Sequence, residues 1–157
     1  MERTSQFRKL LEAEIPRLQR YARVLTRDPV RTDDLVQTSL ARALAKRELW
    51  RYGIELRPWL FAIMHNENAN DLRRAARDGS FIVPGAAPPA TAEPNAFATL
   101  ELRDLNRALA ELTAEQREVI LLVGVECMTY QEVATVLKLP VGTVRHAFRA
   151  AAANSAG

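Results

Sequence analysis

Two histidines and one cysteine are the side chains of this 157-residue chain best suited to metal or nucleophilic chemistry. His65 stands two residues before Glu67, whereas a zinc hydrolase needs two histidines one helical turn apart. The other histidine is His146, and Cys127 has no second cysteine with which to form a disulfide or a zinc site. No serine–histidine–aspartate set, glycine-rich phosphate loop or paired carboxylate site can be assembled. We therefore expect no enzyme, no catalytic residue, no metal and no cofactor, and we interpret Cys127 as a packing residue.

A second kind of chemistry, recognition of another molecule by a short helix, fits the last third of the chain. Thr113 is followed three residues later by Gln116, and Thr129 by Glu132, so each pair can form a reciprocal capping box at a helix start. Pro140 suits the first turn of a third helix, where its missing N–H costs nothing. A helix, a tight turn and a second helix can set a recognition helix into the DNA major groove. Three short amphipathic helices also make ordinary bundles, in which the same apolar residues are only core.

The residues around these signals resemble the fourth conserved region of small bacterial sigma factors of the extracytoplasmic-function type. The resemblance lies in residues 112–119, 130–134 and 140–145, which read Leu-Thr-Ala-Glu-Gln-Arg-Glu-Val, Tyr-Gln-Glu-Val-Ala and Pro-Val-Gly-Thr-Val-Arg. Such factors direct RNA polymerase to promoters, and this region reads the minus-thirty-five element. The resemblance implies contacts to that DNA from Thr143, Arg145, His146 and Arg149.

The net charge of +3 is unevenly distributed along the chain. Residues 1–78 carry 16 Lys and Arg against 11 acids, whereas residues 97–157 carry 6 bases against 7 acids. A basic first half suits phosphate contacts, because pairing of cations with phosphates releases counterions. The slight acidity of the second half is unusual for a DNA reader. No run approaches about 18 apolar residues and the N-terminus lacks an apolar signal core, so we expect a cytoplasmic protein without membrane insertion.

Three helices are predicted in the first half. Apolar residues recur with helical spacing over residues 5–27, with arginines on the opposite face, and Pro16 must kink this helix or begin a new one. Asp28 followed by Pro29 is typical of a cap and a first helical turn, and that helix is expected to run to about Glu48. The sequence Arg57-Pro58-Trp59 opens the third helix.

The second of these helices carries the pattern Asp33-Asp34-Leu35-Val36-Gln37. Acids near a helix start suit the helix dipole, which explains the aspartates without any partner. The pattern also resembles the second conserved region of sigma factors, which grips the coiled coil of the polymerase β′ subunit. We favour this interface interpretation, in which Asp34, Leu35 and Gln37 face the polymerase with Asp33 beside them.

The third helix resembles the sigma region that melts and captures the minus-ten element. The resemblance rests on residues 58–66, Pro-Trp-Leu-Phe-Ala-Ile-Met-His-Asn, and residues 70–74, Asn-Asp-Leu-Arg-Arg. Aromatic and polar side chains can stack on and hydrogen-bond unpaired bases, and arginines can contact phosphates. The implied DNA contacts are Asn66, Asn70, Arg73, Arg74 and Arg77, with a flipped base near an exposed loop at Trp50 and Tyr52. For Trp59 we favour a place in the core.

The domain organisation follows from a change of composition at residues 79–96, which hold four of the eight prolines. Such a segment cannot pack a core and predicts a flexible Pro/Ala-rich linker that spans at most roughly 60 Å. We expect an all-α protein with a domain at residues 1–78 and a helix-turn-helix domain at residues 97–157. In the second domain, a helix from Phe97 to Leu112 should pack on a helix over residues 114–125.

The end of the chain departs from the family pattern, which continues as Ser-Arg-Leu-x-Arg-Ala-Arg. Residues 146–157 read His-Ala-Phe-Arg-Ala-Ala-Ala-Ala-Asn-Ser-Ala-Gly, so Arg145 and Arg149 are the cations that remain there. A shifted reading frame, an artificial ending and natural divergence each account for the difference. We expect weakened binding to the minus-thirty-five element, with polymerase binding largely retained.

The sequence is therefore interpreted as a monomeric sigma factor that lends promoter specificity to RNA polymerase, in transcription regulation of the kind that serves stress responses. The resemblance implies three partners: the polymerase core, through the β′ coiled coil and the β flap, promoter DNA, and an anti-sigma factor. Two alternatives stay open. The chain could be a stand-alone helix-turn-helix regulator, which would not need the pattern from Asp33 to Gln37, or a non-transcribing protein that titrates an anti-sigma factor.

Overall fold

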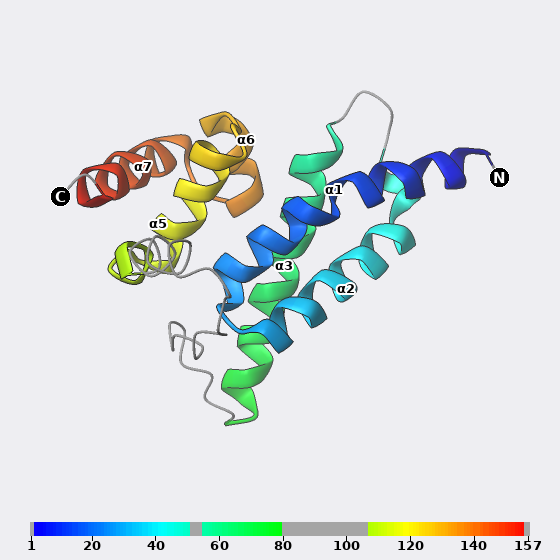
Figure 1. The fold of residues 1–157 in the computed structure, drawn as a ribbon, viewed down its shortest axis with the longest axis horizontal. Helices are drawn as coiled ribbons and strands as arrows, with labels where there is room; N and C mark the ends of the chain where they lie inside the picture. Colours follow the sequence, from blue (N-terminus) through cyan, green and yellow to red (C-terminus); the bar gives the residue numbers. More distant parts are fainter. Residues whose placement is uncertain (1, 51–54, 80–106, 156–157) are drawn as a thin grey trace, which may run out of the picture.

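The computed structural model describes residues 2–50, 55–79 and 107–155, and every element within these ranges is helical. The predicted linker, apart from its first residue, and most of the predicted helix from Phe97 lie outside the described residues. The elements form two groups, a first bundle of α1, α2 and α3 and a second bundle of α5, α6 and α7 (Figure 1). Where the two bundles meet, α6 lies against α3 and α5 lies against α1. In chain order they are α1 (Glu2–Thr26), α2 (Pro29–Ala45), the 3-10 turn η1 (Arg47–Leu49), α3 (Leu56–Arg77), α5 (Ala114–Val119), the π-helical turn η2 (Ile120–Val125), α6 (Tyr130–Leu137) and α7 (Val141–Ser155).

The first bundle is held together by apolar stripes on α1, α2 and α3 that face one another. Its most deeply buried side chains include Leu18, Tyr21, Leu35, Phe61 and Met64, each at most 2% exposed. Full burial of one such side chain contributes about 1.5–3 kcal/mol, so this shared core positions everything on the surface of the bundle.

Two details of the first bundle bear on the predicted helix boundaries. α1 continues through Pro16 without interruption, so the new helix that could have begun there does not form. At the next junction, Asp28 caps α2 as expected, since its side chain accepts a hydrogen bond from the Val30 N–H at 3.0 Å. α2 then ends at Ala45, earlier than predicted, and the short turn η1 follows it.

The second bundle begins at the capping box of Thr113, which is formed in full with Gln116. The single helix predicted over residues 114–125 is instead an α-helix that widens into the π-helical turn η2. The wider turn is fixed where the Glu126 N–H donates to the Leu121 carbonyl at 2.9 Å, five residues back. Glu126 is the residue at which this turn ends.

The last helix, α7, runs through the alanine-rich end of the chain to Ser155. Val144 and Ala151 on its inner face are fully buried, and Ala147 is 6% exposed. α7 packs on both α5 and α6. Residues beyond Arg149 therefore extend the helix and contribute to the packing of this bundle. Within the described ranges, no helix is both long and apolar enough to cross a membrane.

We predict that Ala151→Glu destabilises the chain by about 3 kcal/mol, because it places an unpaired charge in a fully buried position. Ala152→Glu, at the exposed neighbouring position, changes the free energy of unfolding by about 0.5 kcal/mol or less. Urea denaturation of both variants measures the difference. Equal effects would show that the end of α7 does not pack on its bundle.

Candidate nucleic-acid and partner interfaces

The outer face of α3 gathers the polar and basic side chains expected to contact the minus-ten element. Asn70, Arg73, Arg74 and Arg77 are exposed and recur at helical spacing along one face. Together with Ala76, and with Arg42 contributed by α2, they line an open cleft of about 670 Å³. Arg74 is held by Asp71 at 2.8 Å, and Arg73 donates to the Asn70 side-chain oxygen at 3.3 Å. The cleft can accept a chain of phosphates with polar side chains beside them.

A second, smaller cavity of about 320 Å³ adjoins this face, and it is lined by residues of both bundles. Asn66, Asn70 and Arg73 come from α3, Arg42 and Lys46 from α2 and its end, and Lys138 from the turn after α6. The one carboxylate in its wall, Glu67, is 4% exposed and pairs with Arg42 at 2.9 Å. The cavity therefore carries a net positive charge.

Sequence reasoning missed Arg42, Lys46 and Lys138 as parts of these cavities. Arg42 and Lys46 lie on the second helix, away from the motif on the third, and Lys138 lies about seventy residues further along the chain. Helical periodicity places residues on a face of their own helix. It does not show which other helix lies next to that face.

The pattern on α2 that is expected to bind the polymerase divides between surface and core. Asp33, Asp34 and Gln37 are exposed, and within the described part of the chain neither aspartate forms an ion pair. Leu35 is only 2% exposed and belongs to the core of the first bundle. The expectation that Leu35 faces a partner is therefore wrong for this structure: its side chain points inward because α2 is amphipathic, and it supports the face from beneath.

The site predicted for a flipped base is only partly described. Tyr52 lies outside the described residues, and Trp50 is half-buried, with its ring centroid 5.5 Å from that of Phe7. Trp50 therefore packs against the core and does not stand on an exposed loop as expected. Trp59 also packs on Phe7, at 6.2 Å between ring centroids, which agrees with the core position favoured for it.

The helix-turn-helix forms as the capping signals indicate. Thr129 caps α6 in a complete box with Glu132, and Lys138 takes the left-handed conformation, with φ of 58°, that ends the helix. The Pro140 carbonyl accepts from the Thr143 and Val144 N–H groups, so Pro140 stands just before α7 and not within its first turn.

The four residues expected to read the minus-thirty-five element lie on one exposed face of α7. Thr143, Arg145, His146 and Arg149 point outward, opposite the buried positions of the same helix. The Arg145 guanidinium lies 5.7 Å from the centre of the Tyr130 ring, which anchors it against α6. This face can present hydrogen-bond donors and two cations to a groove of duplex DNA.

His65, the one histidine beside a carboxylate in the sequence, takes part in a contact between the bundles. Its Nδ1 lies 2.9 Å from Oε1 of Glu118, and the Tyr21 hydroxyl donates to the same oxygen at 2.9 Å. Burial, and then the neighbouring Glu118 carboxylate, raise the pKa of the Tyr21 hydroxyl well above its usual value, so it stays protonated. Among the described residues, no three His, Cys, Asp or Glu side chains are arranged to hold a metal ion.

Comparison with family models divides the chain in the same way as its folding. Residues 11–65 match the family described as the Sigma2 domain of PhyR, and residues 102–153 match Sigma-70, region 4. The first match covers much of the α1–α3 bundle, and the second covers α5 through most of α7.

Two relatives and two solved structures resemble the chain over most of its length. The ECF RNA polymerase sigma factor EcfG of Rhodopseudomonas palustris is 34% identical over 150 residues, which cover 92% of this chain and 80% of that protein. The RNA polymerase sigma factor CarQ of Myxococcus xanthus is 26% identical over 88% of this chain and 80% of its own. The sigma factor RpoE of Bartonella quintana, solved in complex with the anti-sigma factor NepR, has a TM-score of 0.82 and 28% identity over 96% of this chain and 94% of its own. CnrH, solved with the cytosolic domain of CnrY, has a TM-score of 0.72 and 26% identity over 99% and 90% of the two chains.

We predict that Thr129→Ala lowers the free energy of unfolding by about 1 kcal/mol, because it removes the cap of α6. Thr135→Ala is the matched control in the same helix. Its hydroxyl only bonds the Gln131 carbonyl, and alanine favours a helix interior, so stability should stay the same or rise slightly. Thermal or urea unfolding distinguishes the two, and an equal loss in both variants would contradict a specific role for the cap.

Proposed function

This chain belongs to the extracytoplasmic-function RNA polymerase sigma factors of the sigma-70 family, and we propose that its exposed faces on α2, α3 and α7 divide the task of promoter recognition. Members of this family direct RNA polymerase to promoters and catalyse no reaction themselves. The finer assignment rests chiefly on one observation, the open cleft on α3 lined by Arg42, Arg73, Arg74 and Arg77. In this proposal, residues 1–78 and residues 97–157 act as two DNA-reading domains within one polymerase complex.

The α3 face is assigned to the minus-ten element. An opened strand exposes both its phosphates and the edges of its bases. Arg73, Arg74 and Arg77 supply cations for the phosphates, while Asn66 and Asn70 supply amides that can both donate to and accept from bases. Arg42 extends the same basic surface from α2.

The α2 face is assigned to the polymerase core. Asp33, Asp34 and Gln37 are exposed near the start of the helix. Leu35 packs in the core and holds this helix against the first bundle. Exposed acids without ion pairs in the described chain can pair with a partner's cations without first breaking a contact. The β′ coiled coil is the proposed partner, and the second domain is proposed to rest on the β flap while α7 reads the minus-thirty-five element.

An anti-sigma factor is the proposed regulator, because the Bartonella quintana relative was solved with one over a closely similar fold. The proposed site of action is the cytoplasm, where the proposed partners, polymerase and promoter DNA, are found. The exposed side of α7 presents only Arg145 and Arg149 as cations, so the minus-thirty-five contact is proposed to be the weaker of the two.

Run-off transcription with purified core polymerase and promoter fragments tests the proposed function. We expect specific transcripts with the unaltered chain, and at least a tenfold loss of affinity for core polymerase in Asp34→Arg, because that change reverses a charge at the proposed contact. Glu12→Arg reverses an exposed charge on α1 and should change the affinity by less than twofold. Stable core binding without transcripts would favour the protein that titrates an anti-sigma factor. Absence of both would favour the stand-alone regulator.

The α3 assignment predicts a change in salt dependence. Arg73→Ala should weaken binding of the polymerase complex to promoter DNA and reduce the slope of log affinity against log salt by about 0.7–0.9, the value for one lost phosphate contact. Arg3→Ala removes an exposed cation from the start of α1 and should leave the slope unchanged. Titrations over a range of salt concentrations measure both. An unchanged slope in Arg73→Ala would remove this residue from the DNA contact.

A further inference from the structure

We propose that two buried carboxylates of the second bundle, Glu118 and Glu126, close the free chain into an autoinhibited form by binding donors on the first bundle. The inference rests on the proposed function in one respect, the assignment of the α3 face to DNA. The latch is defined here as Glu118 and Glu126 together with Tyr21, His65, Arg17 and Arg20.

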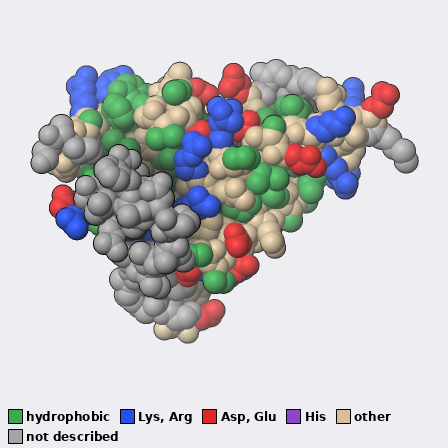
Figure 2. Space-filling model, in the orientation of Figure 1, with side chains coloured by type: hydrophobic (Ala, Val, Ile, Leu, Met, Phe, Trp, Pro, Cys, Tyr) green, Lys and Arg blue, Asp and Glu red, His purple; other side chains and the backbone are tan. Residues whose placement is uncertain are grey.

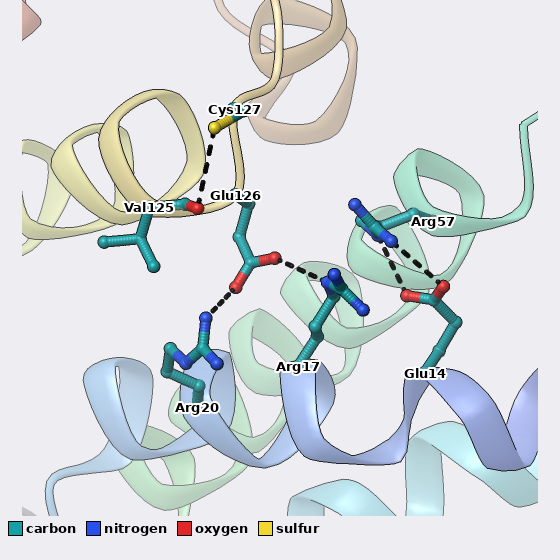
Figure 3. Close-up of polar contacts among 7 residues, drawn as sticks. All are labelled: Glu14, Arg17, Arg20, Arg57, Val125, Glu126 and Cys127. Atoms are coloured by element: carbon teal, nitrogen blue, oxygen red, sulfur yellow. Dashed lines mark hydrogen bonds and ion pairs between the residues drawn. The ribbon is translucent and has the colours of Figure 1, made fainter.

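Glu126 forms the first half of the latch (Figure 3). Its side chain is only 1% exposed, and it lies between Arg20, whose Nη1 is 2.8 Å from Oε1, and Arg17, whose Nε is 3.2 Å from Oε2. Both arginines come from α1 and are 47% and 40% exposed, so most of the desolvation falls on the carboxylate. Glu126 therefore depends on the first bundle for the partners that its charge requires.

Glu118 forms the second half, near the other end of the same helical segment. Its Oε1 receives a hydrogen bond from the fully buried Tyr21 of α1 and lies 2.9 Å from Nδ1 of His65 of α3. The two carboxylates thus bind two different helices of the first bundle. Contacts at both ends of one segment fix its orientation as well as its position.

The helices that carry the donors of the latch, α1 and α3, are joined by an ion pair of their own. Glu14 of α1 accepts from the Nε and Nη2 of Arg57 of α3 at 2.9 and 3.3 Å, one helical turn from Arg17 (Figure 3). This contact ties α1 to α3 independently of the second bundle. The surface that binds Glu126 therefore does not need to be rebuilt each time the bundles meet. Figure 2 shows Lys and Arg side chains gathered near the middle of the face where the bundles adjoin.

The contact is suited to opening as well as to closing. An interface of apolar side chains would expose them to water when the bundles part. The latch instead returns carboxylates, guanidinium groups and an imidazole to water, all of which hydrate well. At the latch itself, separation exchanges one set of polar partners for another. The buried apolar side chains of the two bundles form one core cluster, with α6 packed on α3, so parting the bundles also exposes apolar surface.

The closed arrangement conflicts with promoter binding. Lys138, in the turn of the helix-turn-helix, lines the same cavity as Asn66, Asn70 and Arg73 of the proposed minus-ten face. By their names, the minus-ten and minus-thirty-five elements lie about 25 base pairs apart, which is roughly 85 Å at 3.4 Å per pair along the duplex. Two readers that share one cavity cannot reach both elements, so the chain must open before it acts on a promoter.

The test compares the full-length double variant Glu118→Gln/Glu126→Gln with Glu111→Gln, which removes an exposed charge from the same half of the chain. Spin labels on cysteines introduced at the exposed positions Arg8 and Ala152, in a Cys127→Ser background, report the distance between the bundles. We expect one short distance in the unaltered chain and in Glu111→Gln, and a broad distribution of longer distances in the double variant. We also expect the double variant to bind a single-stranded minus-ten oligonucleotide at least fivefold more tightly in the absence of polymerase.

A charge exchange between the two bundles controls for the possibility that a latch variant opens only because it fails to fold. Arg17→Glu/Arg20→Glu should open the chain, and adding Glu126→Arg should close it again, while circular dichroism shows helix content unchanged. Unchanged distances in both the double variant and Arg17→Glu/Arg20→Glu would overturn the latch. Longer distances without tighter oligonucleotide binding would overturn autoinhibition. In either case run-off transcription by the unaltered chain would still support the proposed function, whereas its absence from the unaltered and the opened chains alike would count against that function.

Discussion

A carboxylate removed from water needs donors or cations nearby, and the arrangement of the two bundles satisfies this requirement for Glu118 and Glu126. Each carboxylate leaves one bundle and finds its partners on the other. The relative position of the two halves is thus set by a few charged and polar contacts in addition to the packing of α6 on α3. Contacts of this kind are directional, so they specify one orientation where an apolar surface alone would permit several.

The same contacts give a physical meaning to the uneven charge of the chain. The first half has an excess of cations and the second half a slight excess of acids. Taken alone, the acidity of a DNA-reading domain is unfavourable for phosphate contacts. In the structure, two of its acids face Arg17, Arg20 and His65, so they act between the domains and not on the outer face of α7. That face keeps Arg145 and Arg149, and no acidic side chain lies within α7.

α3 performs several tasks because its faces differ in chemistry. Its inner face contributes Leu60, Phe61 and Met64 to the core, and its outer face presents asparagines and arginines to the open cleft. On the same helix, Glu67 pairs with Arg42. The other cations of the smaller cavity, Lys46, Arg73 and Lys138, therefore have no further carboxylate in the cavity wall to balance them. His65 extends toward the second bundle. One helix therefore connects the core, the proposed DNA face and the contact between the domains, which makes coupling between DNA binding and domain opening physically direct.

Local chemistry in the sequence determined the capped helix starts and the helical class of the protein. Asp28, Thr113 and Thr129 cap their helices with atoms only two or three residues away, so their roles do not depend on the rest of the fold. The residues on the outward face of α7 were named from the family resemblance. The resemblance between short motifs and a family added the functional interpretation, which the relatives then confirmed at the level of the family.

Tertiary structure alone decided the features that join distant parts of the chain. Leu35 belongs to a motif typical of a binding surface and also to the apolar stripe of α2, and the packing of α1 and α3 against that stripe decides that it is buried. Trp50 is drawn onto Phe7 for the same reason. Arg42 and Lys138 join the cavities of α3 only because three helices meet there. Arg20 lies 106 residues from Glu126 in sequence, and Tyr21 and His65 lie 97 and 53 residues from Glu118. Pairing over such a separation depends on how whole helices pack, and no local pattern of residue types encodes it.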